Sequence, residues 1–174
     1  IINTLPYDRE NITMSVFPLC DECQKEYTTP QNIRCHAQTI ACNDCGPATN
    51  ITIGEAVQTL KSSEILAIKD IGGYHLSCLC KTECALKLRK IKGRETKPFA
   101  VMFKDIDEIA DYCEISDKER ELLLSPARPI VLLKAKKEFP HGVCDNSDFI
   151  GAFLPCNPIQ ILILDKVSPL IMTS

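Results

Sequence analysis

Two pairs of cysteines have the spacing of a metal site. Each pair has the pattern C-x2-C, and eighteen residues separate Cys20 and Cys23 from Cys42 and Cys45. Two residues between thiolates allow a tight turn that points both sulfurs at one ion, and four sulfurs suit tetrahedral Zn²⁺. Because four sulfurs leave no position for a reacting water, we predict a structural zinc, with His36 as an ordinary polar loop residue. An iron–sulfur cluster, a redox pair and four reduced thiols are the alternatives.

Three cations form a second candidate site. Lys92, Arg94 and Lys97 lie on a short segment that contains Gly93 and ends at Pro98, directly before an apolar run. An arginine can grip a carboxylate or phosphate with two hydrogen bonds, while a lysine supplies a point charge. The turn residues constrain the segment, so we predict an anion-binding loop. The alternative is a solvated helix face, which most basic runs are.

A glycine turn is the third candidate. Gly72, Gly73, Tyr74 and His75 follow the apolar residues 65–68, which have the pattern of a buried strand. A glycine pair after a strand lets backbone N–H groups approach a phosphate, although a plain tight turn explains the pair equally well. His75 is a candidate base or donor, and a hydrogen-bonded histidine without a catalytic role is the alternative.

Helical and strand patterns alternate around these motifs. We expect helices at 55–61, 82–91, 105–113, 116–124 and 157–165, and strands at 65–68, 99–103, 129–133 and 170–173. Ser116 is a predicted helix cap, and Pro158 is predicted at the first position of its helix. The alternation predicts an α/β (α+β) fold, with a twisted mixed or mostly parallel sheet and flanking helices.

The composition is that of an ordinary globular chain. Its 174 residues are 45% hydrophobic and 25% charged, with a net charge of −3, which excludes disordered and low-complexity chains. The apolar stretch 159–164 is interrupted by Gln160 and is far shorter than the roughly 18 apolar residues of a membrane span. No leader of basic and then apolar residues opens the sequence, so the predicted location is the cytoplasm. There, the eleven cysteines are expected to be metal ligands or reduced thiols.

The chain is expected to contain two domains. Residues 1–50 are predicted to form a linker and a small finger module, which cannot bury much core and needs a metal to hold it. Residues 54–174 are predicted to form the α/β domain. Because the sequence does not begin with Met and stops within an apolar run, we expect it to be a piece of a longer protein.

Seven segments occur in an order that resembles one family. They are FPLCDECQKEY, CHAQTIACNDCGP, LAIKDIGGYHLSC, RKIKGRETKPFAVM, SPARPIVLL, LPCNPIQ and PLIMTS. Together they resemble the NiFe-hydrogenase maturation carbamoyltransferases, HypF, over nearly the whole chain. The resemblance implies an acylphosphatase-like domain, two C4 zinc fingers, a YrdC-like domain and a Kae1-like domain. Residues 1–50 resemble the end of the finger region, and residues 54–174 resemble a YrdC-like domain truncated at its C-terminal end.

The resemblance also implies an ATP-dependent carbamoyl transfer. Carbamoyl phosphate is hydrolysed, and the carbamate reacts with ATP, which carries Mg²⁺ on its phosphates, to give carbamoyl-adenylate. The carbamoyl group then passes to the C-terminal cysteine of a HypE-type acceptor protein, for the cyanide ligands of the hydrogenase iron. Lys92, Arg94 and Lys97 match the family's basic motif, and Thr173 and Ser174 match the first half of its Thr-Ser-Gly-Asn motif.

Two positions depart from the family pattern. Leu79 stands where an acidic residue is usual, and Ile161 stands where histidine is common. The asparagine that the family carries beyond Ser174 is also absent, as are the acylphosphatase-like and Kae1-like domains. These gaps predict that this chain does not complete carbamoyl transfer alone. Because its glycine pair lets backbone N–H groups approach a phosphate, the segment 72–75 is expected to bind the nucleotide.

Two other hypotheses remain open at this point. YrdC-like domains also resemble modules that bind double-stranded RNA or modify tRNA through a threonylcarbamoyl-adenylate, and the basic stretch 81–97 could hold a phosphate backbone. An acidic chain without tryptophan argues against base stacking. In the other hypothesis the finger has a purely structural role and packs the YrdC-like part against its neighbours.

Overall fold

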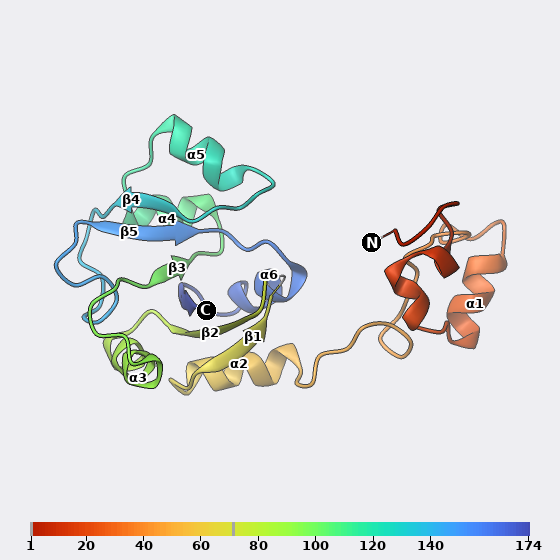
Figure 1. Cartoon of the computed structure of the whole chain (residues 1–174), viewed down its shortest axis with the longest axis horizontal. Coiled ribbons are helices and arrows are strands. Elements are labelled where there is room, and N and C mark those ends of the chain that lie inside the picture. Colours follow the sequence, from red (N-terminus) through yellow and green to blue (C-terminus); the bar gives the residue numbers. More distant parts are fainter. Residues whose placement is uncertain (1, 71) are drawn as a thin grey trace. The chain divides into compact units, whose positions relative to one another are not determined.

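The computed structural model describes residues 2–70 and 72–174 and divides into two units, Ile1–Asn50 and Ile51–Ser174. Residues 1 and 71, which fall within the two expected domains, lie outside the described residues. Each unit has its own secondary structure (Figure 1). Within the described ranges, no helix has the length and apolar content needed to cross a bilayer.

The first unit is held together by polar contacts more than by an apolar core. It contains the 3-10 helices η1 (Arg9–Asn11) and η2 (Thr13–Val16) and the helix α1 (Asp21–Thr28). Its buried apolar side chains in the described part are Ile12, Cys23 and Ile40. The Arg9 guanidinium donates to three backbone carbonyl oxygens at 2.7–2.9 Å, those of Phe17, Gln38 and Ile40. One side chain thereby joins segments that no regular secondary structure connects.

Helix α1 lies outside the elements predicted from the sequence. Its residues, DECQKEYT, include one buried side chain, Cys23, and carry no apolar stripe. A short polar helix of this kind leaves no periodic signal, because tertiary contacts and not an apolar face hold it in place.

The second unit is built on one six-stranded sheet. Its strands are β1 (Leu66–Lys69), β2 (Tyr74–Leu79), β3 (Ala100–Met102), β4 (Val131–Lys134), β5 (Phe149–Phe153) and β6 (Leu170–Thr173). Their order is β1-β2-β6-β3-β5-β4 (Figure 1). Strands β3 and β5 are parallel, and the other four pairs are antiparallel. The predicted mixed sheet with flanking helices is confirmed, whereas the alternative of a mostly parallel sheet is wrong.

A mostly parallel sheet was compatible with the predicted strands because two strands, β2 and β5, were not among them, and both form antiparallel pairs. Strand β2 follows β1 and pairs with it antiparallel, and β5 does the same with β4. Strand β2 carries His75 and Ser77, so its pattern is not continuously apolar. Strand β5 contains Gly151, which weakens a strand pattern. That glycine has a packing reason, since a Cβ there would lie 3.0 Å from Cγ2 of Ile130.

Five helices flank the sheet. They are α2 (Ile53–Lys61), α3 (Thr82–Lys92), α4 (Ile106–Tyr112), α5 (Asp117–Leu124) and α6 (Pro158–Leu164). Every predicted helix and strand is present, with ends that differ from the prediction by at most two residues. The largest fully buried side chains of this unit come from both helices and strands: Leu60, Leu88, Phe99, Met102, Phe103, Ile109, Leu123, Leu133, Ile150, Ile163 and Leu164.

Capping residues fix the helix ends. The Ser116 hydroxyl accepts from the Glu119 N–H at 3.4 Å, and the Glu119 carboxylate accepts from the Ser116 N–H at 2.8 Å, which confirms Ser116 as a helix cap. Thr52 and Glu55 form the same reciprocal pair at α2. Helix α3 ends at Gly93, which has a left-handed φ of 56°. The chain therefore turns sharply into the segment that carries the predicted anion-binding residues.

The substitution Glu119→Gln should weaken the α5 cap in a pH-dependent way. Hydrogen bonds from the side chain and then the backbone of Ser116 lower the pKa of the Glu119 carboxyl below its ordinary value of 4.5. A carboxyl with a lowered folded-state pKa stabilises the fold above its unfolded-state pKa, and this contribution is lost as the pH falls through the folded-state value. The difference in Tm between wild type and variant should therefore be present at about pH 7 and shrink toward about pH 3.

Thermal unfolding followed by circular dichroism across that range measures the effect. Glu121→Gln, at an exposed position on the same helix, is the matched control. A difference in Tm that stays constant with pH would contradict the proposed role of the carboxylate.

Candidate metal centre and anion-binding pocket

The sulfur atoms of four cysteines form one cluster in the first unit. The Sγ atoms of Cys20, Cys23, Cys42 and Cys45 all lie within 4.8 Å of one another. Cys42 Sγ lies 3.7 Å from Cys20 Sγ and 3.7 Å from Cys45 Sγ. Four sulfurs placed tetrahedrally at about 2.3 Å from one zinc ion are about 3.8 Å apart. The donor set and its spacing therefore fit an S4 zinc site.

The second cysteine pair is carried by a turn that requires glycine. The Gly46 N–H donates to the Cys42 carbonyl oxygen at 2.8 Å, and a Cβ at Gly46 would lie 2.8 Å from the same oxygen. Backbone hydrogen bonds at Cys20 and Cys42 lower the pKa of the Cys45 thiol to about 6, whereas burial raises the pKa of Cys23 to about 12. A cation among the sulfurs would favour the thiolate at every position.

A pocket of about 450 Å³ in the second unit brings together predicted site residues from three parts of the chain. The predicted site residues that line it are His75, Arg94, Lys97, Thr173 and Ser174. They come from β2, from the loop between α3 and β3, and from the end of β6. The pocket thus joins the basic loop, part of the glycine-turn segment and the C-terminal Thr-Ser pair.

Arg94 is anchored where the basic loop meets β6. Its Nη1 donates to Thr173 Oγ1 at 3.0 Å. Its Nη2 and Nε donate to the carbonyl oxygens of Pro98 (2.6 Å) and Lys97 (3.0 Å), and its guanidinium carbon lies 5.0 Å from the centre of the Phe99 ring. Burial, followed by a neighbouring arginine, lowers the pKa of Arg94, yet an arginine stays charged at neutral pH. The pocket therefore holds a fixed cation.

The floor of the pocket is a row of side chains on one face of the sheet. Ala100 pairs with Met172 on β6 and with Gly151 on β5, and Gly151 pairs with Leu132 on β4. Directly paired residues on neighbouring strands share a face, and all four line the pocket. The two smallest, Ala100 and Gly151, lie at the centre of the row, and the Ile130 side chain packs against Gly151.

Asp70 is a pocket residue that sequence reasoning missed. Its side chain lines the pocket and is 14% exposed. The carboxylate accepts from Asn157 Nδ2 at 3.1 Å and from Gln160 Nε2 at 2.8 Å. Its Oδ2 atom also lies 3.7 Å from His75 Nδ1. The sequence offered one signal, an acidic residue that follows a buried strand and stands just before the glycine pair.

The remaining predicted residues do not line this pocket. They are Gly72, Gly73, Tyr74 and Lys92. Lys92 is the exposed last residue of α3, and Tyr74 is 68% exposed at the start of β2. The carbonyl oxygen of Gly73 accepts from the Asp70 N–H at 2.7 Å, so the glycine pair closes the tight turn between β1 and β2.

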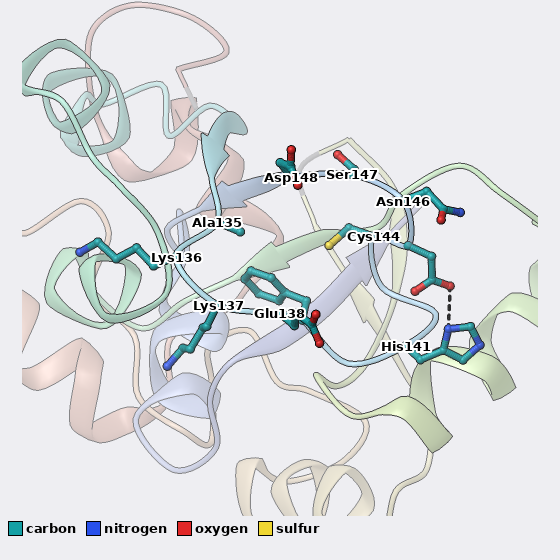
Figure 2. Close-up of a pocket in the computed structure, with 11 residues that line it drawn as sticks. Ala135, Lys136, Lys137, Glu138, His141, Cys144, Asn146, Ser147 and Asp148 are labelled. Atoms are coloured by element: carbon teal, nitrogen blue, oxygen red, sulfur yellow. Dashed lines mark ion pairs between the residues drawn. The ribbon is translucent and has the colours of Figure 1, made fainter.

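A larger hollow of about 830 Å³ lies in the loop between β4 and β5 (Figure 2). It contains Cys144, and His141 Nδ1 lies 3.0 Å from Asp145 Oδ2. Burial, followed by the charge of Asp145, raises the pKa of the Cys144 thiol, which disfavours a thiolate nucleophile. In Figure 2, Lys136 and Lys137 extend to the opposite side of the loop from His141, and both ammonium groups contact α4. The hollow therefore presents neither an activated thiol nor free cations.

Two known families match this chain. Residues 19–52 match the HypF finger, and residues 58–174 match the Sua5/YciO/YrdC family, described as telomere recombination. The carbamoyltransferase HypF of Rhodobacter capsulatus is 39% identical over 100% of this chain, which spans 25% of that protein. The probable carbamoyltransferase HypF of Methanocaldococcus jannaschii is 40% identical over 70% of this chain and 16% of its own length. The chain thus spans a quarter or less of these curated relatives.

A solved structure is similar over the full chain. The crystal structure of full-length HypF in the phosphate- and nucleotide-bound form is 42% identical, with a TM-score of 0.84 over 100% of this chain and 25% of that one. The resemblance predicted from the seven sequence segments is therefore confirmed.

The substitution Asp70→Ala should destabilise the second unit by about 2–4 kcal/mol. It would leave the half-buried amide group of Asn157 and the buried amide group of Gln160 without their shared acceptor, and each such loss costs about 1–3 kcal/mol. Urea unfolding of the second unit measures the change. Glu121→Ala, an exposed control, should cost less than about 0.5 kcal/mol. A cost for Asp70→Ala no larger than the control would contradict the network described above.

Proposed function

Because the chain belongs to the Sua5/YciO/YrdC family and matches HypF carbamoyltransferases over its whole length, we propose that its second unit is the adenylating part of a carbamoyltransferase. In this proposal, carbamate reacts with ATP to give carbamoyl-adenylate and pyrophosphate. One observation carries the proposal: Arg94, Lys97 and Thr173 line a single pocket, with the Arg94 guanidinium bonded to the Thr173 hydroxyl at 3.0 Å.

The proposed reaction brings two anions together. A carboxylate oxygen of carbamate attacks the α-phosphorus of ATP, and pyrophosphate leaves. Cations lower the activation barrier of this step when they neutralise the charges of carbamate and ATP and hold the two reactants in line. Arg94 offers a rigid planar set of donors, and Lys97 offers a point charge on a flexible stem. Lys92 would add a third cation from the end of α3, and Mg²⁺ on the triphosphate would neutralise further charge.

The other predicted residues are proposed to bind the nucleotide. Thr173 and Ser174 offer hydroxyl groups at the end of β6, and the turn 72–74 offers backbone N–H groups. His75 lies beside the Asp70 carboxylate and could donate to a phosphate or ribose oxygen. Asp70 would then hold the turn and the imidazole in place, because its carboxylate is tied to the start of α6 through Asn157.

The wider reaction sequence is part of the same proposal. Carbamoyl phosphate would be hydrolysed by an acylphosphatase-like domain, and the carbamoyl group would pass to the C-terminal cysteine of a HypE-type acceptor in the cytoplasm. The product would serve the cyanide ligands of a NiFe hydrogenase. We propose residues 1–50 and 54–174 as the finger and YrdC-like domains. Since the chain spans a quarter of its relatives, we propose that it does not complete the transfer alone.

The four cysteines of the first unit are proposed to bind a structural zinc ion. Three observations support this: the S4 donor set, sulfur separations of 3.7 Å, and the match of residues 19–52 to the HypF finger. Four sulfur ligands leave no position for substrate, so the ion would stabilise the fold and would not react.

Binding of Mg-ATP should depend on the basic loop. The variants Arg94→Ala and Lys97→Ala each remove one charge from the pocket, and loss of a charge-assisted hydrogen bond of about 1.5–3 kcal/mol corresponds to a Kd increase of about tenfold or more. Isothermal titration of the wild-type chain and the variants measures Kd. Lys90→Ala, at an exposed position on α3 outside the pocket, is the control and should change Kd less than about twofold.

Equal Kd values for wild type and both loop variants would place the nucleotide elsewhere and reject the proposed site. If the chain instead binds double-stranded RNA with an affinity that falls steeply with salt and does not bind Mg-ATP, the RNA-binding alternative is favoured.

Zinc removal should act on the first unit alone. Because that unit buries few apolar side chains, chelation should unfold it while the second unit keeps its thermal transition. Metal analysis should give one zinc per chain, and Cys42→Ser should abolish it. Hydrogen exchange resolved by peptide measures the two units separately. Unchanged protection of residues 19–46 after complete zinc loss would contradict the structural role.

A further inference from the structure

Arg89 does not line the pocket, yet it contacts three backbone carbonyl groups of the basic loop. It belongs to the last turn of α3 and is half-buried. Its Nη1 atom lies within donor distance of three loop carbonyl oxygens, those of Arg94 (2.9 Å), Glu95 (3.0 Å) and Lys97 (3.4 Å). The Arg89 guanidinium is therefore a hydrogen-bond donor to the backbone carbonyl groups of the basic loop, and two side chains of that loop, Arg94 and Lys97, line the pocket.

A second contact ties the same guanidinium to another part of the unit. Arg89 Nε donates to the carbonyl oxygen of Gly142 at 2.7 Å. Gly142 lies in the loop between β4 and β5, has a φ of 89°, and would place a Cβ 3.2 Å from Cβ of Ala85 on α3. The next residue, Val143, accepts from the Phe99 N–H at 2.9 Å. The β4–β5 loop thus approaches α3 closely enough to hold Arg89 by a contact outside the basic loop.

The aromatic ring of Phe99 adds a third constraint. The guanidinium carbons of Arg89 and Arg94 lie 4.8 Å and 5.0 Å from the ring centre. Phe99 is 1% exposed, so its position is set by the core. The ring holds two like charges near each other, which their mutual repulsion would otherwise separate.

From these contacts we propose that Arg89 is the positioning residue of the adenylating site. It acts through the backbone of residues 94–97 and holds the Arg94 and Lys97 side chains at the pocket without touching substrate. A lysine at position 89 would keep the charge, but its single ammonium group could not replace a planar set of donors that reaches both loops. The inference rests on the proposed function for the identity of the ligand, and on the contacts alone for the effect on the loop.

The first experiment tests the effect on the loop without any ligand. Hydrogen exchange of peptides that cover residues 93–99 should be at least tenfold faster in Arg89→Lys than in wild type. Lys90→Ala, which removes a charge from the neighbouring exposed position, should leave the exchange unchanged. Thermal unfolding should show that both variants keep the second unit folded. Unchanged exchange in a folded Arg89→Lys variant would overturn the proposal, whatever the chain binds.

The second experiment separates positioning from direct contact. With Mg-ATP as the probe, Arg89→Lys should raise Kd at least tenfold in the wild-type background and by a clearly smaller factor in an Arg94→Ala background, where only Lys97 remains to be positioned. Such non-additivity is expected if Arg89 acts through Arg94 and Lys97. Equal fold-changes in the two backgrounds would indicate a direct contact and overturn the positioning role.

The two experiments fail in distinguishable ways. If wild type does not bind Mg-ATP but exchange in the loop rises in Arg89→Lys, the adenylation proposal fails and the role of Arg89 in shaping the loop stands. If Mg-ATP binds and requires Arg94, but Arg89→Lys changes neither exchange nor Kd, the adenylation proposal stands and the present inference fails.

Discussion

The antiparallel pairing of β3 with β6 is the constraint on which the pocket depends. Ala100 lies opposite Met172, so the residues just before β3 and those just after Met172 meet at the same end of the strand pair. This geometry brings Arg94 to Thr173, although 79 residues separate them in sequence. A slip of β6 by one residue would turn Met172 to the other face and disrupt the pocket floor. The pocket that we propose as the anion site thus depends on strand register as well as on charge.

The pocket combines mobile and fixed charges. Arg94 is tied to two carbonyl oxygens and one hydroxyl, so it needs little reorganisation when an anion arrives. Lys97 is exposed and retains the freedom of its side chain. Asp70 places a carboxylate in the same pocket. Hydrogen bonds from two side-chain amides replace part of the water that this carboxylate would otherwise bind. A buried carboxylate with its own partners can orient neighbouring groups without occupying the cations that an anionic ligand needs.

The sequence predicts the local features of this chain and misses the non-local ones. The cysteine pairs and the Ser116 cap are each defined within a few residues, and each was predicted. The contacts of Asp70 join residues 87 and 90 positions apart, and no local pattern contains them. Strand β5 was missed because Gly151 interrupts its apolar run, and that glycine is required by the close approach of Ile130. The features that the sequence did not predict, the Asp70 contacts and strand β5, therefore depend on contacts with distant segments of the chain.

The two units differ in the interactions that stabilise their folded states. The second buries large side chains from every one of its helices and most of its strands, so apolar burial can offset the conformational entropy of folding. The first has three buried apolar side chains among its described residues and relies on the contacts of Arg9 and on four converging sulfurs. Hydrogen bonds from one arginine contribute modestly to stability in water. Metal binding supplies far more, because its free energy is realised only when the ligands are held together. The proposed zinc ion would therefore supply to the first unit the stabilisation that the second unit obtains from apolar burial.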